Sequence, residues 1–215
     1  MTMKRLMTMA VVTALGLATI HSQDAKPLYQ NNFEQAVVDQ VPDGFLVLDG
    51  GFVVKEEGGN KFLELPGAPL DTFGVLFGPS EGINVAVSAK IFGTGKGRRL
   101  PAFAIGLNGA GGFRLQVSAA KKLLELYRGE EVVASAPYEW QSGSWTMLKL
   151  QLREPKAGEW KVEGKAWTQG VPEPKDWAIS HDAKEKPNSG RPSVWGNPFA
   201  GTPIRFDDLT LVAAK

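Results

Sequence analysis

The sequence predicts an all-β protein, in which a single antiparallel β-sandwich domain follows an N-terminal signal peptide. Runs of alternating apolar and polar residues recur along the chain, and clusters of Gly, Pro and Asn separate them. The chain has 215 residues, and all-β sandwiches of about 200–250 residues commonly form one domain. It contains no cysteine, so we expect a hydrophobic core without disulfide bonds.

Residues 1–22 have the layout of a secretory signal peptide. Lys4 and Arg5 precede an apolar stretch from Leu6 to Ile20, which is shorter than the roughly 20 residues of a membrane span. We expect cleavage after Ser22, which gives a mature domain of residues 23–215 that is secreted or periplasmic; an uncleaved N-terminal anchor is the alternative. No later segment reaches spanning length without charges, so we expect no membrane span in the mature chain.

The predicted strands follow in chain order. Alternation predicts strands over residues 83–91, 102–108 and 113–118, which glycine-rich turns separate. Residues 123–128 and 132–136 form the next pair, and residues 145–152 and 160–167 form a further hairpin. The last strand covers residues 204–212, where a slip in the alternation near Asp207 and Asp208 indicates a β-bulge. Residues 118–127 also fit a short helix, which the neighbouring strand patterns disfavour.

Residues 170–203 interrupt this regular pattern. The segment contains six prolines, and proline cannot donate a hydrogen bond to a β-ladder. We therefore predict an irregular connection here and no central strand. A connection this long within a compact domain is usually functional or partly disordered.

Several short motifs resemble the concanavalin A-like lectin and glucanase superfamily, a jelly-roll β-sandwich found in secreted bacterial proteins. These motifs are Asn32-Phe33-Glu34, residues 142–150 (SGSWTMLKL), residues 164–167 (GKAW), residues 171–177 (VPEPKDW), residues 189–192 (SGRP) and residues 204–211 (IRFDDLTL). The resemblance covers about residues 28–212. It implies a concanavalin A-like sandwich, and it relates the chain to lectins, laminin-G-like binding modules, glycoside hydrolases and 3-keto-disaccharide hydrolase-like domains.

Polar and aromatic side chains at outward positions of the predicted strands are candidates for binding a carbohydrate. A sugar site needs a few polar groups together with an aromatic surface, and Trp167 is the main candidate for that surface because it lies among charged residues. The candidate binding residues are Trp167, Arg114, Gln116, Gln151, Trp177 and Trp195. An antiparallel sheet also exposes a polar face without any ligand, so a structural or interaction domain without a small ligand is an alternative.

The sequence supports binding more than catalysis. Glycoside hydrolysis usually needs two carboxylates beside the scissile bond, and the Glu-x-Asp-x-x-Glu pattern of the superfamily's glucanases is absent. Glu163 is the candidate catalytic acid, but Lys161 and Lys165 would favour its ionised form. The Gly-Asn-Ser-Gly segment of the keto-disaccharide hydrolase group is also missing. A glycan-acting hydrolase is therefore the alternative to a carbohydrate-binding module.

The resemblance further implies a structural calcium between the first and last strands, since such sandwiches often hold one there. Glu34 and Asp207 are the expected ligands, because calcium prefers carboxylate and carbonyl oxygens; the alternative is that Glu34 pairs with Arg205. No other cofactor is indicated. The 24 basic and 23 acidic residues give no electrostatic footprint for nucleic acid, so the expected partner is a carbohydrate or a cell-surface glycan.

Overall fold

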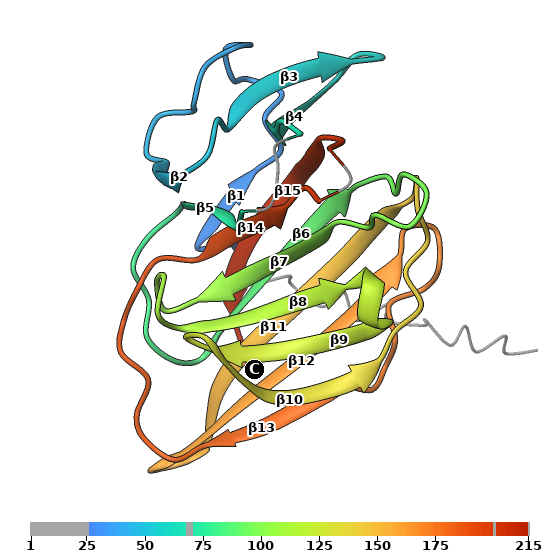
Figure 1. The fold of residues 1–215 in the computed structure, drawn as a ribbon. Coiled ribbons are helices and arrows are strands. Elements are labelled where there is room, and N and C mark those ends of the chain that lie inside the picture. The colour runs from blue at the N-terminus through green and yellow to red at the C-terminus, as the bar shows by residue number, and fades with distance from the viewer. Residues whose placement is uncertain (1–25, 68–70, 200, 215) are drawn as a thin grey trace, which may run out of the picture.

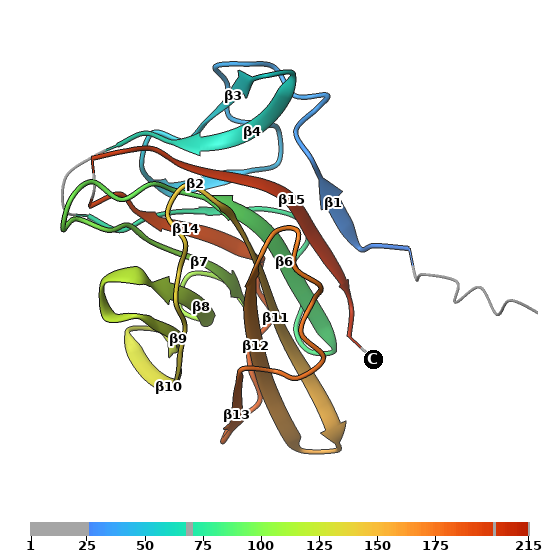
Figure 2. The ribbon, with the colours of Figure 1, turned by 90° about the vertical axis from the view of Figure 1, so that its right-hand side faces the viewer.

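A computed structural model describes residues 26–67, 71–199 and 201–214. The predicted signal peptide, residues 1–22, lies outside the described residues. Two antiparallel sheets pack face to face in one sandwich, which confirms the predicted fold class (Figures 1 and 2). In the part of the chain that the structure describes, no helix has the length and apolar character needed to cross a membrane.

The first sheet has eight strands within the described residues. Their order is β13 (Ile179–Ala183), β12 (Glu159–Thr168), β11 (Trp145–Lys156), β6 (Val85–Phe92), β15 (Ile204–Ala213), β4 (Asn60–Leu65) and β3 (Val53–Glu57), with β1 (Tyr29–Asn31) paired to β15. The first and last strands therefore lie side by side, with Tyr29 opposite Leu211. The register of β15 against β6 shifts between Asp207 and Thr210, which confirms the predicted bulge.

The second sheet has seven strands in the same described ranges. Their order is β10 (Glu131–Pro137), β9 (Leu123–Arg128), β8 (Phe113–Ser118), β7 (Ala102–Leu107), β14 (Ser193–Asn197), β5 (Phe73–Leu76) and β2 (Leu46–Asp49). The connection from β8 to β9 is a single 3₁₀ turn, η1 (Ala119–Lys121). The helix considered over residues 118–127 is therefore not formed, because β9 continues the sheet.

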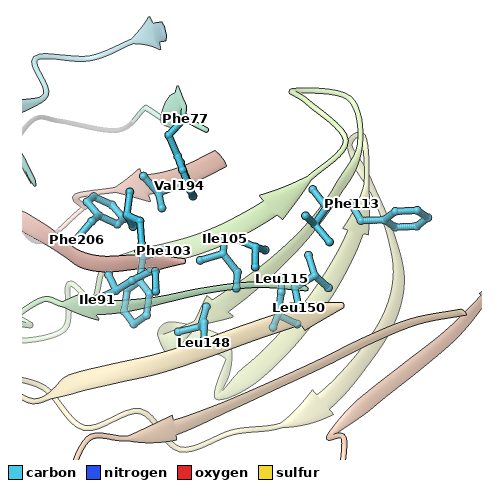
Figure 3. Close-up of a cluster of buried hydrophobic side chains, with 14 of the residues drawn as sticks. Phe77, Ile91, Phe103, Ile105, Phe113, Leu115, Leu148, Leu150, Val194 and Phe206 are labelled. Carbon is cyan, nitrogen blue, oxygen red and sulfur yellow. The ribbon is translucent and has the colours of Figure 1, made fainter. Parts of the chain in front are cut away.

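Alternation builds the core between the two sheets. Ile105 and Leu115 of the seven-stranded sheet and Leu148 and Leu150 of the eight-stranded sheet are fully buried, and they face one another across the sandwich (Figure 3). Gly164 of β12 provides space for Leu115, because a Cβ there would lie 2.5 Å from the leucine Cδ1. Every second residue of these strands consequently points outward, so the molecule has two outer sheet faces.

The structure corrects the prediction that residues 170–203 form an irregular segment. This segment contains β13 at the edge of the eight-stranded sheet and β14 between β7 and β5 of the seven-stranded sheet. Pro192 and Pro198 lie just outside β14, so all five of its residues can take part in the ladder. Prolines that flank a strand thus permit a central position that prolines within it would forbid.

Candidate functional site

The six predicted binding residues lie on two opposite faces of the sandwich. Arg114 and Gln116 on β8 and Trp195 on β14 alternate with core residues and point outward from the seven-stranded sheet. Gln151 on β11 and Trp167 on β12 point outward from the eight-stranded sheet, and Trp177 packs beside them through Lys165. One ligand cannot contact both groups, because the hydrophobic core separates them.

The guanidinium of Arg114 is held by two aromatic rings on the outer face of the seven-stranded sheet. Its Cζ lies 4.8 Å from the ring centroid of Tyr127 and 5.3 Å from that of Trp195. Tyr127 is directly opposite Arg114 in the pairing of β8 with β9, whereas Trp195 lies on the other side of β7. Each ring attracts the cation through its negative face, so the two rings position the arginine side chain.

Two glycines allow the Trp195 ring to lie against the sheet. Gly74 is opposite Trp195 in the pairing of β14 with β5, and a Cβ at Gly74 would lie 2.4 Å from the indole ring. Gly106 on β7 lies on the other side, where a Cβ would be 2.4 Å from Ser193 Oγ. The indole Nε1 donates a 2.8 Å hydrogen bond to this same hydroxyl, which fixes the ring on the outer face.

A buried carboxylate, Glu125, lies beside these aromatic and cationic groups. It accepts hydrogen bonds from Ser118 Oγ, from Lys121 Nζ at 3.0 Å and from the Tyr127 hydroxyl at 3.1 Å. Burial alone would raise the pKa of Glu125, but the bonds from Ser118, Lys121 and Tyr127 outweigh it and hold the pKa below its usual value. Burial and the neighbouring Glu125 charge raise the pKa of Tyr127, so its phenol keeps its proton at neutral pH.

Arg114 and Tyr127, together with Ser118 and Lys121 that bind Glu125, border a cavity of about 330 Å³ on the outer face of the seven-stranded sheet, which we call the Arg114 pocket. The pocket has aromatic walls in Tyr127 and Phe199, the latter 38% exposed. It is lined by Thr72, Leu100, Pro101, Ala102, Arg114, Gln116, Ser118, Ala119, Ala120, Lys121, Tyr127, Glu130, Asn197 and Phe199. Aromatic walls with a few polar groups between them are typical of a small-molecule site.

Two polar atoms of the Arg114 pocket are buried without a hydrogen-bond partner among the described residues. They are the Nε of Arg114 and the Oδ1 of Asn197. The amide nitrogen of Asn197 donates to Thr72 Oγ1 at 3.1 Å, so only its oxygen is left. Buried polar groups in proteins almost always have a partner, and the exceptions here are a donor and an acceptor in the same pocket.

The outer face of the eight-stranded sheet differs, because its charges neutralise one another. Glu163 accepts a 2.9 Å ion-paired hydrogen bond from Arg153 and a 2.7 Å bond from Gln151. Lys161 and Lys165, the lysines expected to favour the ionised form of Glu163, pair with Asp182 and Glu173. Glu163 is bound within the protein, which leaves it unsuited to proton transfer to a ligand.

The connection between β12 and β13 covers part of the same face. Glu173 pairs with Lys149 at 2.9 Å and with Lys165 at 2.8 Å, and Lys165 also donates to the Pro174 carbonyl at 2.6 Å. The Lys165 ammonium lies 4.5 Å from the ring centroid of Trp177. Trp177 thus anchors this connection on the sheet, and half-buried Trp167 lies on the same outer face.

The two predicted calcium ligands are engaged with other groups. Asp207 accepts a hydrogen bond from Asn60 and pairs with Lys90, whose ammonium lies 3.0 Å from both Asp207 and Asp208. Glu34 accepts a bond from the Lys61 amide, while Arg205 pairs with Glu57 and Glu64. An ammonium therefore lies where a metal would have to bind Asp207, and no cluster of three or more acidic, His or Cys side chains that could hold a metal occurs within the described residues. The structural calcium stays a prediction.

A larger cavity of about 460 Å³ lies near the N-terminal edge, around Asn31 and Pro42. Its lining consists mainly of amide side chains and two exposed valines, with no aromatic residue. A saccharide would find hydrogen bonds there but no ring on which to stack. The Arg114 pocket combines both, so it is the better candidate site.

Sequence reasoning identified Arg114, Gln116 and Trp195 but missed Tyr127, Glu125, Asn197 and Phe199. For two of these residues a signal was present. Counting outward from the β8–β9 turn places Glu125 opposite Gln116 and Tyr127 opposite Arg114, on the same face. Asn197 and Phe199 had no comparable signal, because their place depends on inserting β14 between β7 and β5.

Comparison with known proteins identifies the class of fold. No protein-family profile matches the sequence, and a search of curated proteins finds no similar chain. Among solved structures, the chain is similar to a carbohydrate-binding module, CBM66 from Bacillus subtilis, with a TM-score of 0.55 and 14% identity over 79% of this chain and 95% of that one. It is also similar to the metal-free carbohydrate recognition domain of Emp46p, with a TM-score of 0.61 and 12% identity over 89% and 100% of the two chains.

A third similar structure is a protein of unknown function with a galectin-like fold from Bacillus subtilis, with a TM-score of 0.56 and 10% identity over 89% of this chain and 97% of that one. At these identities the likeness establishes the fold. The fold of the chain is therefore that of a galectin-like β-sandwich, which agrees with the concanavalin A-like sandwich that its motifs implied. Its structural neighbours include domains that recognise carbohydrates.

Proposed function

We propose that this protein is an exported, non-catalytic carbohydrate-binding module that holds its saccharide in the Arg114 pocket. The observation that carries the proposal is the pocket's combination of two aromatic walls with buried polar atoms that have no hydrogen-bond partner among the described residues. Tyr127 and Phe199 offer surfaces for the C–H faces of a sugar ring, while Asn197 and Arg114 offer an acceptor and donors for its polar groups. The sequence of residues 1–22 supports export to a secreted or periplasmic location.

The carboxylates of the pocket support binding rather than hydrolysis. A glycosidase needs one carboxylic acid that donates a proton and a second carboxylate across the scissile bond. Glu125 has a lowered pKa and is held by Ser118, Lys121 and Tyr127, so it is ionised and fully occupied. Glu130, the other carboxylate that lines the pocket, is exposed in the turn between β9 and β10.

Glycan-array binding followed by calorimetric titration with the best saccharide tests the proposal. We expect Phe199→Ala to weaken binding by about tenfold, because a stacking wall is lost. The matched variant is Trp167→Ala on the opposite sheet face, which should bind as the unaltered protein does. The reverse pattern would move the site to the eight-stranded sheet, and a protein that binds no glycan at all would refute the proposal.

The same saccharides, incubated with the protein and analysed for products, test the absence of catalysis. We expect no turnover. Turnover that Glu125→Gln or Glu163→Gln abolishes would establish a hydrolase instead.

A further inference from the structure

We infer that the saccharide recognised in the Arg114 pocket is acidic and that its carboxylate, as in a uronic acid, binds the Arg114 guanidinium. This inference rests on the proposed function and narrows it to one chemical class of ligand. Arg114 differs in its charge partners from Lys121 at the same pocket and from Arg153 and Lys165 on the opposite face, each of which pairs with an acid.

Arg114 has no anionic partner among the described residues. No carboxylate lies within ion-pair distance of it and no acceptor receives a hydrogen bond from it, and its Nε is buried. In contrast, Arg153 and Lys165 on the opposite face each pair with an acid. A half-buried guanidinium that has lost part of its water without gaining an acceptor carries a free-energy cost, which an arriving anion would remove.

The aromatic neighbours hold Arg114 in place but do not replace an anion. Tyr127 and Trp195 attract the guanidinium through their ring faces at 4.8 and 5.3 Å, and a ring face is a poor substitute for oxygen acceptors on the N–H groups. A guanidinium presents its donors as a planar fork that matches the two oxygens of a carboxylate. Two rings that restrict the side chain reduce the entropy that binding would otherwise cost.

The other charges around the pocket leave this cation uncompensated. Lys121 and Glu125 pair at 3.0 Å and neutralise each other, and Arg128 lies 3.6 Å from Glu185. Glu130 also lines the pocket, but it is exposed in a turn where water screens its charge. The half-buried guanidinium is therefore the charge that a ligand within the pocket meets with the least screening.

The polar groups beside Arg114 suit the hydroxyl groups of the same sugar. Asn197 Oδ1 is a buried acceptor without a donor, and Gln116 uses its amide nitrogen on Ser118 Oγ at 2.9 Å, which leaves its oxygen. Sugar hydroxyls can donate to both amide oxygens while a carboxylate accepts from Arg114. A uronic acid residue carries both kinds of group on one ring, whereas a simple carboxylic acid does not.

The test compares oligouronates of several stereochemistries with the same oligomers after chemical reduction of their carboxyl groups to neutral sugars. We expect an oligouronate to bind and its reduced form to bind at least about tenfold more weakly. Arg114→Gln should cause a similar loss, and Arg114→Lys an intermediate one, because lysine keeps the charge without the fork. Lys149→Gln removes one positive charge from the opposite face, where Lys165 still pairs with Glu173, and it should leave affinity unchanged.

The outcomes separate this inference from the function on which it rests. Equal binding of the charged and reduced oligomers, or an Arg114→Gln variant that binds as the unaltered protein does, would refute an acidic ligand and leave carbohydrate binding intact. Binding only to sulfated sugars would refute the carboxylate assignment. Failure to bind any charged or neutral saccharide would refute both proposals. Circular dichroism of each variant would show that it is folded.

Discussion

The two outer faces of this sandwich arise from the same alternation of residues, yet they differ in how their charges are satisfied. On the eight-stranded sheet, Glu163 is bound by Arg153 and Gln151, and Lys165 is bound by Glu173 and Pro174. On the seven-stranded sheet, Arg114 lies against the rings of Tyr127 and Trp195 and has no carboxylate partner among the described residues, and a cavity of about 330 Å³ lies beside it.

This difference shows why a polar sheet face is poor evidence for a ligand site. Both faces carry Trp, Arg, Gln and Glu, so composition does not distinguish them. A face whose donors and acceptors are matched within the protein is complete without a ligand. A face that leaves a buried donor and a buried acceptor unmatched has the hydrogen-bonding capacity that recognition requires.

The largest expected change in stability comes from removing one arginine charge from each face, Arg153 on one and Arg114 on the other. Arg153→Met should lower the free energy of unfolding by about 2–3 kcal/mol, because it leaves buried Glu163 without its cation. Arg114→Met should cost less than about 1 kcal/mol, since it removes two cation–π contacts but also an unpaired donor. Urea unfolding of both variants measures this, and equal losses would contradict the comparison.

A second prediction concerns the space that Gly74 leaves for Trp195. Gly74→Leu should displace the indole ring, lower the free energy of unfolding by about 2 kcal/mol and abolish saccharide binding. Urea unfolding followed by tryptophan fluorescence measures the change in stability, and calorimetric titration measures the loss of saccharide binding. Gly158 on the β11–β12 turn of the other sheet has open space around it, and Gly158→Asn, which tolerates its positive φ, should change neither.

A third prediction follows from the lowered pKa of Glu125. The folded protein binds this proton less readily than the unfolded chain does, so stability is gained above the usual glutamate pKa of 4.5 and lost as the pH falls through the lower folded value. At pH 7, Glu125→Gln should reduce the free energy of unfolding by about 1 kcal/mol. The difference between the two proteins should shrink as the pH falls below 4.5, and a difference that is constant down to acid pH would be inconsistent with this assignment.

The smallest effect is expected at the connection that covers the eight-stranded sheet. Glu173 is 42% exposed, so Glu173→Gln should lower the free energy of unfolding by only about 0.5 kcal/mol. Saccharide affinity should not change, because Glu173 lies on the face opposite the Arg114 pocket. Thermal unfolding and titration of the same sample give both values; a loss of affinity would link the two faces in a way that the structure does not explain.

Much of the fold could be predicted from local pattern. Strands such as residues 113–118 and 145–152 alternate clearly, and glycine-rich turns mark their ends. Alternation also showed that Arg114 and Trp167 point away from the core. Alternation could not show that these two residues lie on opposite sides of the sandwich. A period of two distinguishes inward from outward positions on a strand, but it does not show to which sheet that strand belongs.

The parts of the fold and of the candidate site that local pattern did not predict depend on contacts between segments far apart in sequence. The strand at Ser193–Asn197 has only five residues between two prolines, and its central position is decided by pairing with β7 and β5. Trp195 therefore reaches Arg114 across about 80 residues of chain, through space that Gly74 and Gly106 provide. No local pattern predicts this contact between Trp195 and Arg114. The pairing of Arg114 opposite Tyr127, by contrast, follows from the short turn between β8 and β9.

The positions of β14 and β15 have a consequence for the order in which this molecule can assemble. β14 fills the middle of one sheet, between β7 and β5, and β15 fills the middle of the other, between β6 and β4. A nascent chain that lacks the segment from Ser193 to Ala213 leaves a gap in both layers at once, with unpaired edges on either side. Completion of the sandwich, and with it the placement of the Trp195 ring that flanks Arg114, must therefore wait until the chain has been synthesised and released as far as Ala213.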